Sequence, residues 1–126
     1  MIMDEKTIKG ILQNGERETL ECKRAKSEVP KSVWETYSAF ANTIGGMILL
    51  GIEENKKEKI FQKRFQIIGV DDAQKIVTDF WNTINSDKVN ENILTNSDVE
   101  IVNLNKVQIV CIRVPQADWR QKPIFL

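Results

Sequence analysis

Two clusters of basic side chains are the residues of this 126-residue chain whose types and spacing best suit contact with phosphate. If both clusters lie at one end of a sheet, they would follow a phosphate backbone, and Phe61, between the lysines of the second cluster, could stack on a base. The alternative is that they are only solvated surface. The clusters consist of Lys23, Arg24, Lys26 and Lys31, and of Lys56, Lys57, Lys59, Lys63 and Arg64.

A polar turn, Asn42-Thr43-Ile-Gly45-Gly46, is the second stretch that could meet a phosphate, through its backbone amides. It lacks the Gly-Lys-Ser/Thr of a P-loop, and it leads into a strand instead of a helix, so no helix N-terminus would face the anion. The favoured reading is therefore structural, with Asn42 hydrogen-bonding local backbone. Contact with phosphate stays open as the alternative.

Glu21 and Lys23 form a third candidate pair, because period-two alternation places them on the same face of a half-buried strand. The acid-x-lysine spacing resembles that of a nuclease superfamily in which the lysine stabilises a pentavalent phosphate. A match of three residues is a weak signal, however. The pair is more simply read as a solvated strand face with a weak ion pair.

Composition limits the classes of function. Eighteen basic and eighteen acidic residues cancel, so the chain has no global field for nucleic acid and any binding surface must be local. The absence of histidine removes catalytic triads that use imidazole as base. Cys22 and Cys111 lie in apolar strand contexts without CxxC spacing, which indicates a reduced, cytoplasmic chain without a zinc site. No apolar run approaches the length of a membrane span.

The elements that would position these residues are organised around the glycine turn. Apolar residues at helical spacing predict a helix over 32–41, with Ser32 and Glu35 in the pattern of a capping box. Gly45 and Gly46 end it, because glycine readily takes the left-handed conformation that closes a helix. The apolar run Met47 to Ile52 then predicts a strand buried on both faces.

The other elements are predicted from similar patterns. We expect a packing helix over 3–13, a strand over 16–23, a hairpin or long loop leading to a strand over 65–70, and a helix capped by Asp71-Asp72 that ends near Ser86. A loop over 87–98 precedes two β-branched strands, 99–104 and 107–114, joined by Asn105-Lys106. The order predicts one α+β domain over 1–126, a two-layer sandwich with two main helices on one face of a mixed sheet. Pro123-Ile-Phe-Leu resembles the start of another strand, so we expect the chain to be part of a longer protein.

Three segments carry a family resemblance: Leu20-Glu-Cys-Lys23, Ala39-Phe-Ala-Asn-Thr-Ile-Gly-Gly46 with the strand after it, and Ile68-Gly-Val70. Over residues 14–126 the chain resembles the Schlafen-type Alba-like domain, also catalogued as a divergent AAA or DNA-binding domain of bacterial transcriptional regulators. The resemblance implies a nucleic-acid-binding module of such a regulator, with DNA or RNA as partner. It also implies a homodimer and an ATP-binding label.

The same resemblance implies an alternative function. Animal Schlafen proteins, which are similar, carry a metal-dependent RNase site of three acids, which match Glu16, Glu21 and Glu54, or Glu53 in place of the last. Such carboxylates would need Mg²⁺ or Mn²⁺ to bridge them, and no cofactor is otherwise expected. Many relatives have Asp-Asp-Gly where this chain has Glu53-Glu-Asn, which leaves the third acid open. Because nothing in the local sequence fixes these acids together, they are more simply interpreted as surface charges.

Overall fold

A computed structural model describes residues 4–13, 19–86, 88–104 and 106–126, apart from the side chains of Phe61 and Gln62. Its larger sheet has the strand order β1-β2-β6-β5. β1 (Leu20–Lys23) is parallel to β2 (Gly46–Leu50), whereas β6 (Val107–Val114) is antiparallel to both β2 and β5 (Val99–Leu104). A two-stranded sheet pairs β3 (Ile52–Glu54) with β4 (Phe65–Ile67). The main sheet is therefore mixed, as predicted.

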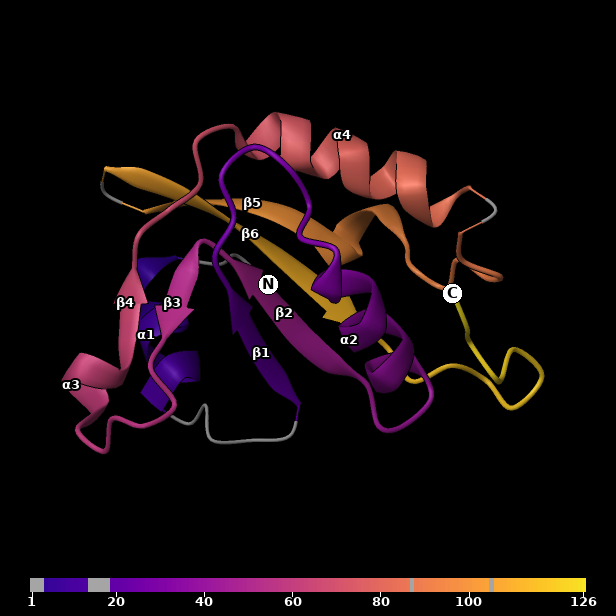
Figure 1. Cartoon of the computed structure of the whole chain (residues 1–126), viewed down its shortest axis with the longest axis horizontal. Coiled ribbons are helices and arrows are strands. Elements are labelled where there is room, and N and C mark those ends of the chain that lie inside the picture. The colour runs from indigo at the N-terminus through magenta and orange to yellow at the C-terminus, as the bar shows by residue number, and fades with distance from the viewer. Residues whose placement is uncertain (1–3, 14–18, 87, 105) are drawn as a thin grey trace.

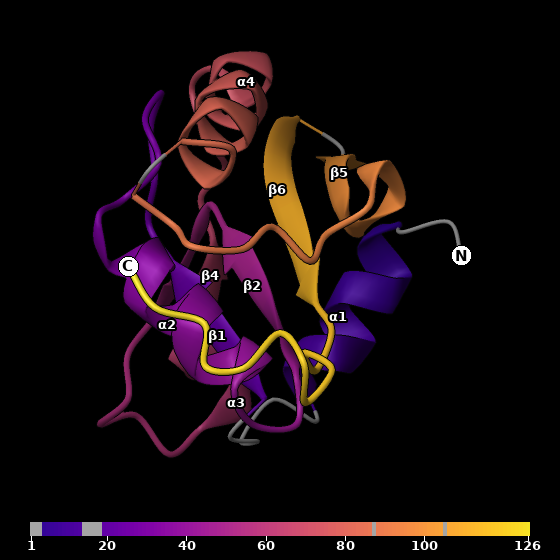
Figure 2. The same cartoon turned by 90° about the vertical axis from the view of Figure 1, so that its right-hand side faces the viewer.

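Helices cover both faces of the main sheet, but unequally. α2 (Ser32–Ala41) and α4 (Ala73–Ile84) share one core with the sheet, and the shorter α1 (Glu5–Gln13) packs on the opposite face (Figure 2). Two short elements, α3 (Phe61–Arg64) and the 3₁₀ turn η1 (Asn96–Asp98), lie between strands. The predicted α+β fold with two main helices on one face is confirmed.

Alternation along the strands explains the two cores. In β2, Ile48 and Leu50 face α2 and α4, whereas Leu49 faces α1 together with Cys22 and Cys111. All five side chains are buried. Successive strand residues point to opposite faces, so an unbroken apolar run is what a strand covered on both sides requires.

The start of α2 differs from the predicted capping box. The helix begins at Ser32 as expected, but Lys31 is the N-cap and no side chain caps it. The backbone replaces the cap, because the carbonyl of Pro30 accepts the amide hydrogen of Val33 at 3.0 Å. At α4 the prediction is confirmed, since the Asp72 side chain accepts from the Lys75 amide at 3.1 Å.

Gly51 divides the apolar run that we predicted as a single strand. Its φ of +106° turns the chain from β2 into β3, a conformation that residues with a Cβ rarely adopt. Its amide donates to the carbonyl of Lys23 at 2.8 Å, and its carbonyl accepts from Ile68 and Gly69. β4 accordingly ends at Ile67, short of the predicted strand over 65–70, and Val70 makes only an isolated bridge to Gln108.

The C-terminal segment after β6 is not the strand that Pro123-Ile-Phe-Leu suggested. Residues 115–126 form turns and extended chain beside α2 (Figure 2), and Ile124 is buried there. The hairpin strands β5 and β6 have the predicted bounds, and the loop before them contains η1. Among the described residues, no helix combines the length and apolarity needed to span a bilayer.

Candidate nucleic-acid interface

The first basic cluster reaches the second only in part: Lys23 and Arg24 lie where β3 runs beside the edge of β1, whereas Lys31 is the N-cap of α2. The hydrogen bond from Gly51 to Lys23 brings the start of β3 to the end of β1. From there β3, α3 and β4 form a ribbon at one end of the molecule (Figure 1). We call residues 52–67 the β3–β4 ribbon.

Ion pairs join the ribbon to β1. Arg24 lies 3.7 Å from Glu53, and Lys56 lies 3.7 Å from Glu21, which is also 3.9 Å from Lys23. Arg24 and Lys56 remain about two-thirds exposed, so each pair contributes little to stability. The acids nevertheless neutralise part of the basic surface, which is therefore mixed in charge.

Glu54 and Arg64 form the most buried ion pair of the ribbon. Nε and Nη2 of Arg64 donate to the same Oε2 of Glu54 at 3.2 and 3.1 Å, and the two side chains are 18% and 11% exposed. Arg64 also lies 5.7 Å from the centre of the Phe65 ring. These contacts hold α3 against the end of β3.

Two of the three predicted carboxylates, Glu21 and Glu54, belong to β1 and β3, which lie beside each other. Burial, together with the charges of Glu54 and Glu21, raises the pKa of Cys22 to about 12. Each carboxylate already has a cationic partner, Arg64 or Lys56. Glu16, the remaining predicted ligand, lies outside the described residues. Within the described part of the chain, no three carboxylate, thiol or imidazole groups are arranged to hold a metal ion.

Besides Lys31, four of the predicted basic residues are exposed and make no ion pair with any described residue: Lys26, Lys57, Lys59 and Lys63. The carbonyl of Lys26 accepts from the amides of Asp71 and Asp72, so it lies beside the start of α4. The other three belong to the ribbon. Lys63 borders a pocket of about 380 Å³ whose further lining residues are Glu53, Glu54, Asn55, Arg64 and Gln66.

The Asn42–Gly46 turn uses its polar groups within the fold. Asn42 bonds the backbone of Ile124 instead of local backbone: Nδ2 donates to the carbonyl at 2.7 Å, and Oδ1 accepts the amide hydrogen at 2.7 Å. The Thr43 hydroxyl donates to the carbonyl of Ala39, and the Gly45 amide to that of Phe40, both at 2.8 Å.

Each of the two glycines of this turn is required for a different reason. Gly45 has a φ of +81°, and a Cβ there would lie 2.7 Å from the carbonyl oxygen of Val114. A Cβ on Gly46 would lie 2.6 Å from the Phe40 ring. These contacts are those of a structural turn that packs the end of α2 against β6.

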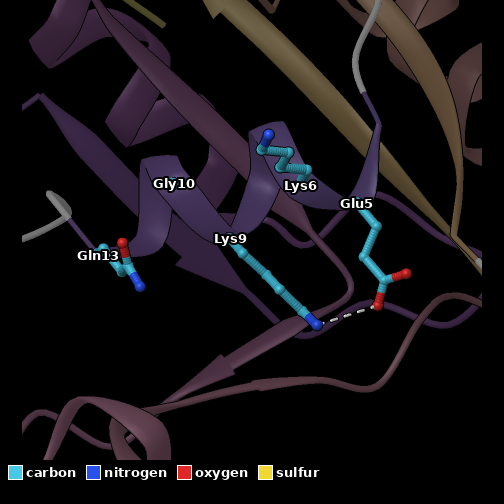
Figure 3. Close-up of a pocket in the computed structure, with 5 residues that line it drawn as sticks. All are labelled: Glu5, Lys6, Lys9, Gly10 and Gln13. Carbon is cyan, nitrogen blue, oxygen red and sulfur yellow. Dashed lines mark ion pairs between the residues drawn. The ribbon is translucent and has the colours of Figure 1, made fainter.

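A pocket of about 500 Å³ on the outer side of α1 was not predicted (Figure 3). Its only ion pair among the lining residues joins Lys9 to Glu5 at 3.4 Å, one helical turn apart. The i, i+4 spacing of these charges beside Gly10 is the signal that the sequence offered. Its lining residues are Glu5, Lys6, Lys9, Gly10 and Gln13.

An α+β fold built around a Gly-Gly turn is what the sequence resemblance to Schlafen-type domains implied. The family model described as Schlafen, AlbA_2 matches residues 16–124, so the chain belongs to this family. A similar solved structure is the NMR structure of the N-terminal domain of an ATP-dependent DNA helicase RecG-related protein from Nitrosomonas europaea. The two are 25% identical with a TM-score of 0.75, and the match covers 98% of this chain and 80% of the other. No curated protein matches the chain.

Proposed function

We propose that this domain is a nucleic-acid-binding module of a bacterial transcriptional regulator, and that the β3–β4 ribbon contacts the phosphate backbone. One observation carries the proposal: Lys57, Lys59 and Lys63 are exposed on the ribbon without an acidic partner among the described residues. A lysine without an internal partner is available to a phosphate and releases the counterions that phosphate holds. Family membership and the name of the RecG-related neighbour support the same class of partner.

The basic residues that form ion pairs have a different role in this proposal. Arg64 and Glu54 fix the shape of the ribbon, and Glu21 and Glu53 hold Lys56 and Arg24 beside β1. Because the chain has no net charge, attraction is confined to the ribbon and is sensitive to salt. Contacts with phosphates alone are tolerant of sequence. Homodimerisation belongs to the same proposal, and sedimentation of the purified chain tests it.

A second candidate is a nuclease that uses Glu21, Glu54 and Glu16 with Mg²⁺ or Mn²⁺. The observation in its favour is that Glu21 and Glu54 belong to β1 and β3, which lie beside each other. A divalent cation would have to displace Lys56 and Arg64 from these carboxylates. Bound there, the metal would supply an activated water for phosphodiester hydrolysis.

Both candidates are tested by gel shift and cleavage on the same labelled tRNA, single-stranded RNA and duplex DNA, with Mg²⁺, Mn²⁺ or EDTA. We expect retardation without cutting. Substitution of Lys57, Lys59 and Lys63 by glutamine should reduce the slope of log affinity against log salt by about 2 to 3, because each phosphate contact contributes about 0.7 to 0.9.

The matched control removes three exposed lysines outside the ribbon and outside both basic clusters, Lys6, Lys88 and Lys106, and changes the net charge equally. Equal losses in the two triple variants would refute the ribbon as the interface. Metal-dependent cutting that Glu21→Gln abolishes would replace the binding module by the nuclease.

A further inference from the structure

The turn that follows β6 presents a tryptophan to solvent. Trp119 is 77% exposed, whereas Trp34 lies 5.0 Å from the ring of Phe80, stacked against the core. Both ends of the segment that carries Trp119 are anchored. The buried Ala117 donates its amide hydrogen to the carbonyl of Ala41 at 2.8 Å, and Ile124 is buried beside α2. Its position is thus set by the fold although the ring is not part of the core.

Three hydrogen bonds fix the tip of the turn. The Gln121 amide donates to the carbonyl of Asp118 at 2.8 Å, and the Asp118 amide donates to Oε1 of Gln121 at 2.8 Å. The Arg120 amide donates to Oδ1 of Asp118 at 3.0 Å. The backbone of such a pre-organised turn loses little conformational entropy on binding, which favours recognition by the side chain that it carries.

Charge around the ring favours an anionic partner. The Arg120 guanidinium carbon lies 5.3 Å from the centre of the Trp119 ring, in the range of a cation–π contact. Neither Arg120 nor Lys122 forms an ion pair with a described acid. The neighbouring Asp118 carboxylate accepts from the backbone of its own turn. The local surface therefore combines an exposed aromatic ring with two cations that form no ion pair among the described residues.

We propose that Trp119 stacks on an unpaired base of single-stranded nucleic acid, with Arg120 and Lys122 on the adjacent phosphates. This inference rests on the proposed function and names its substrate class. Bases within a duplex are already stacked and paired, so an aromatic platform of this kind selects single strands. The turn lies at the end of the molecule opposite to the β3–β4 ribbon (Figure 1), so it is a second contact region.

The test measures fluorescence anisotropy of the full chain with labelled oligo-dT and oligo-U of about 12 nucleotides and with a duplex of equal length. Trp119→Ala should weaken single-strand binding by roughly 5- to 150-fold and leave duplex binding unchanged. Trp119→Phe, which keeps an aromatic face, should retain most of the affinity. Ile44→Ala, at a site 70% exposed, is the control for loss of apolar surface.

Two variants separate this inference from the proposed function. If Trp119→Ala binds single strands as the wild type does while the ribbon lysine variant binds them weakly, the stacking site is overturned and the proposed function stands. If Trp119→Ala weakens binding and the ribbon lysine variant does not, the stacking site is supported and the ribbon is refuted as an interface. If the wild type binds no nucleic acid, and Trp119→Ala instead changes the sedimentation of the chain, the ring contacts protein and the inference is overturned.

Discussion

Replacement of Asn42 by alanine should destabilise the domain without a direct effect on nucleic-acid contact. Asn42 makes two bonds of 2.7 Å to Ile124, which lies 82 residues further along the chain and is almost fully buried. Ser38 donates to the same Ile124 carbonyl at 2.6 Å and would remain in place. The Ile124 amide would lose its partner.

The magnitude follows from these contacts. A net hydrogen bond is worth about 1 kcal/mol, and an amide left without a partner away from water costs about 1 to 3 kcal/mol. We therefore expect Asn42→Ala to lower the free energy of unfolding by about 2 to 3 kcal/mol. With an unfolding entropy of about 2.1 cal/mol/K per residue, the 126 residues give a fall in Tm of roughly 8 to 11 °C.

Urea unfolding followed by circular dichroism measures this effect, and two further variants show which hydrogen bond contributes to it. Ser38→Ala removes one of the two donors to the Ile124 carbonyl and should cost about 1 kcal/mol. Asn42→Asp keeps the acceptor for the Ile124 amide but loses the donor, and it places a carboxylate against a carbonyl oxygen. It should therefore be no more stable than Asn42→Ala.

The outcome that contradicts this reasoning is a stability of Asn42→Ala within about 0.5 kcal/mol of the wild type. If such a variant also bound nucleic acid less tightly, the turn would be a phosphate contact and its bonds to Ile124 would be incidental. Binding must therefore be compared at a temperature at which each variant is folded.

Two further predictions concern the ribbon and the thiols. A double-mutant cycle with Glu54→Gln and Arg64→Gln should give a coupling of about 1 to 3 kcal/mol in urea unfolding, because the pair is largely buried and doubly bonded; a value under about 0.5 kcal/mol would contradict this. Burial raises the pKa of Cys22 to about 12 and that of Cys111 to about 11, from 9.0 when exposed. The thiols of the unfolded chain lose their protons at lower pH than those of the folded chain. The free energy of unfolding should therefore be independent of the thiols below about pH 9 and should decrease as the pH rises from 9 towards 12. Cys22→Ala should make this decrease smaller.

Local spacing was sufficient for the elements that the core requires. The helix over 32–41 and the strands over 99–104 and 107–114 have their predicted bounds, because apolar residues at periods of three to four or two must face a core wherever it lies. The cap of α4 by Asp72 was predictable for a similar reason, since donor and acceptor are three residues apart.

The break at Gly51 was not predictable from the apolar run that contains it. A Cβ at this residue would lie 3.1 Å from the carbonyl carbon of Gly69 and from a methyl group of Ile109, which belong to other parts of the chain. The need for glycine, and hence the turn from β2 into β3, arises from this close approach. A period-two or continuous pattern carries no information on such contacts.

The sequence by itself determined the fold class, the main helices, the strands of the last hairpin, the family and the location of basic residues along the chain. Only the tertiary structure decided that Arg24, Lys56 and Arg64 are paired with acids, that Lys57, Lys59 and Lys63 have no acidic partner in the described part of the chain, and that Asn42 binds Ile124. The physical reason is the distance along the chain over which each kind of interaction acts. Secondary structure follows from residues a few positions apart, whereas ion pairing and hydrogen bonding between strands depend on distances that only the folded backbone sets.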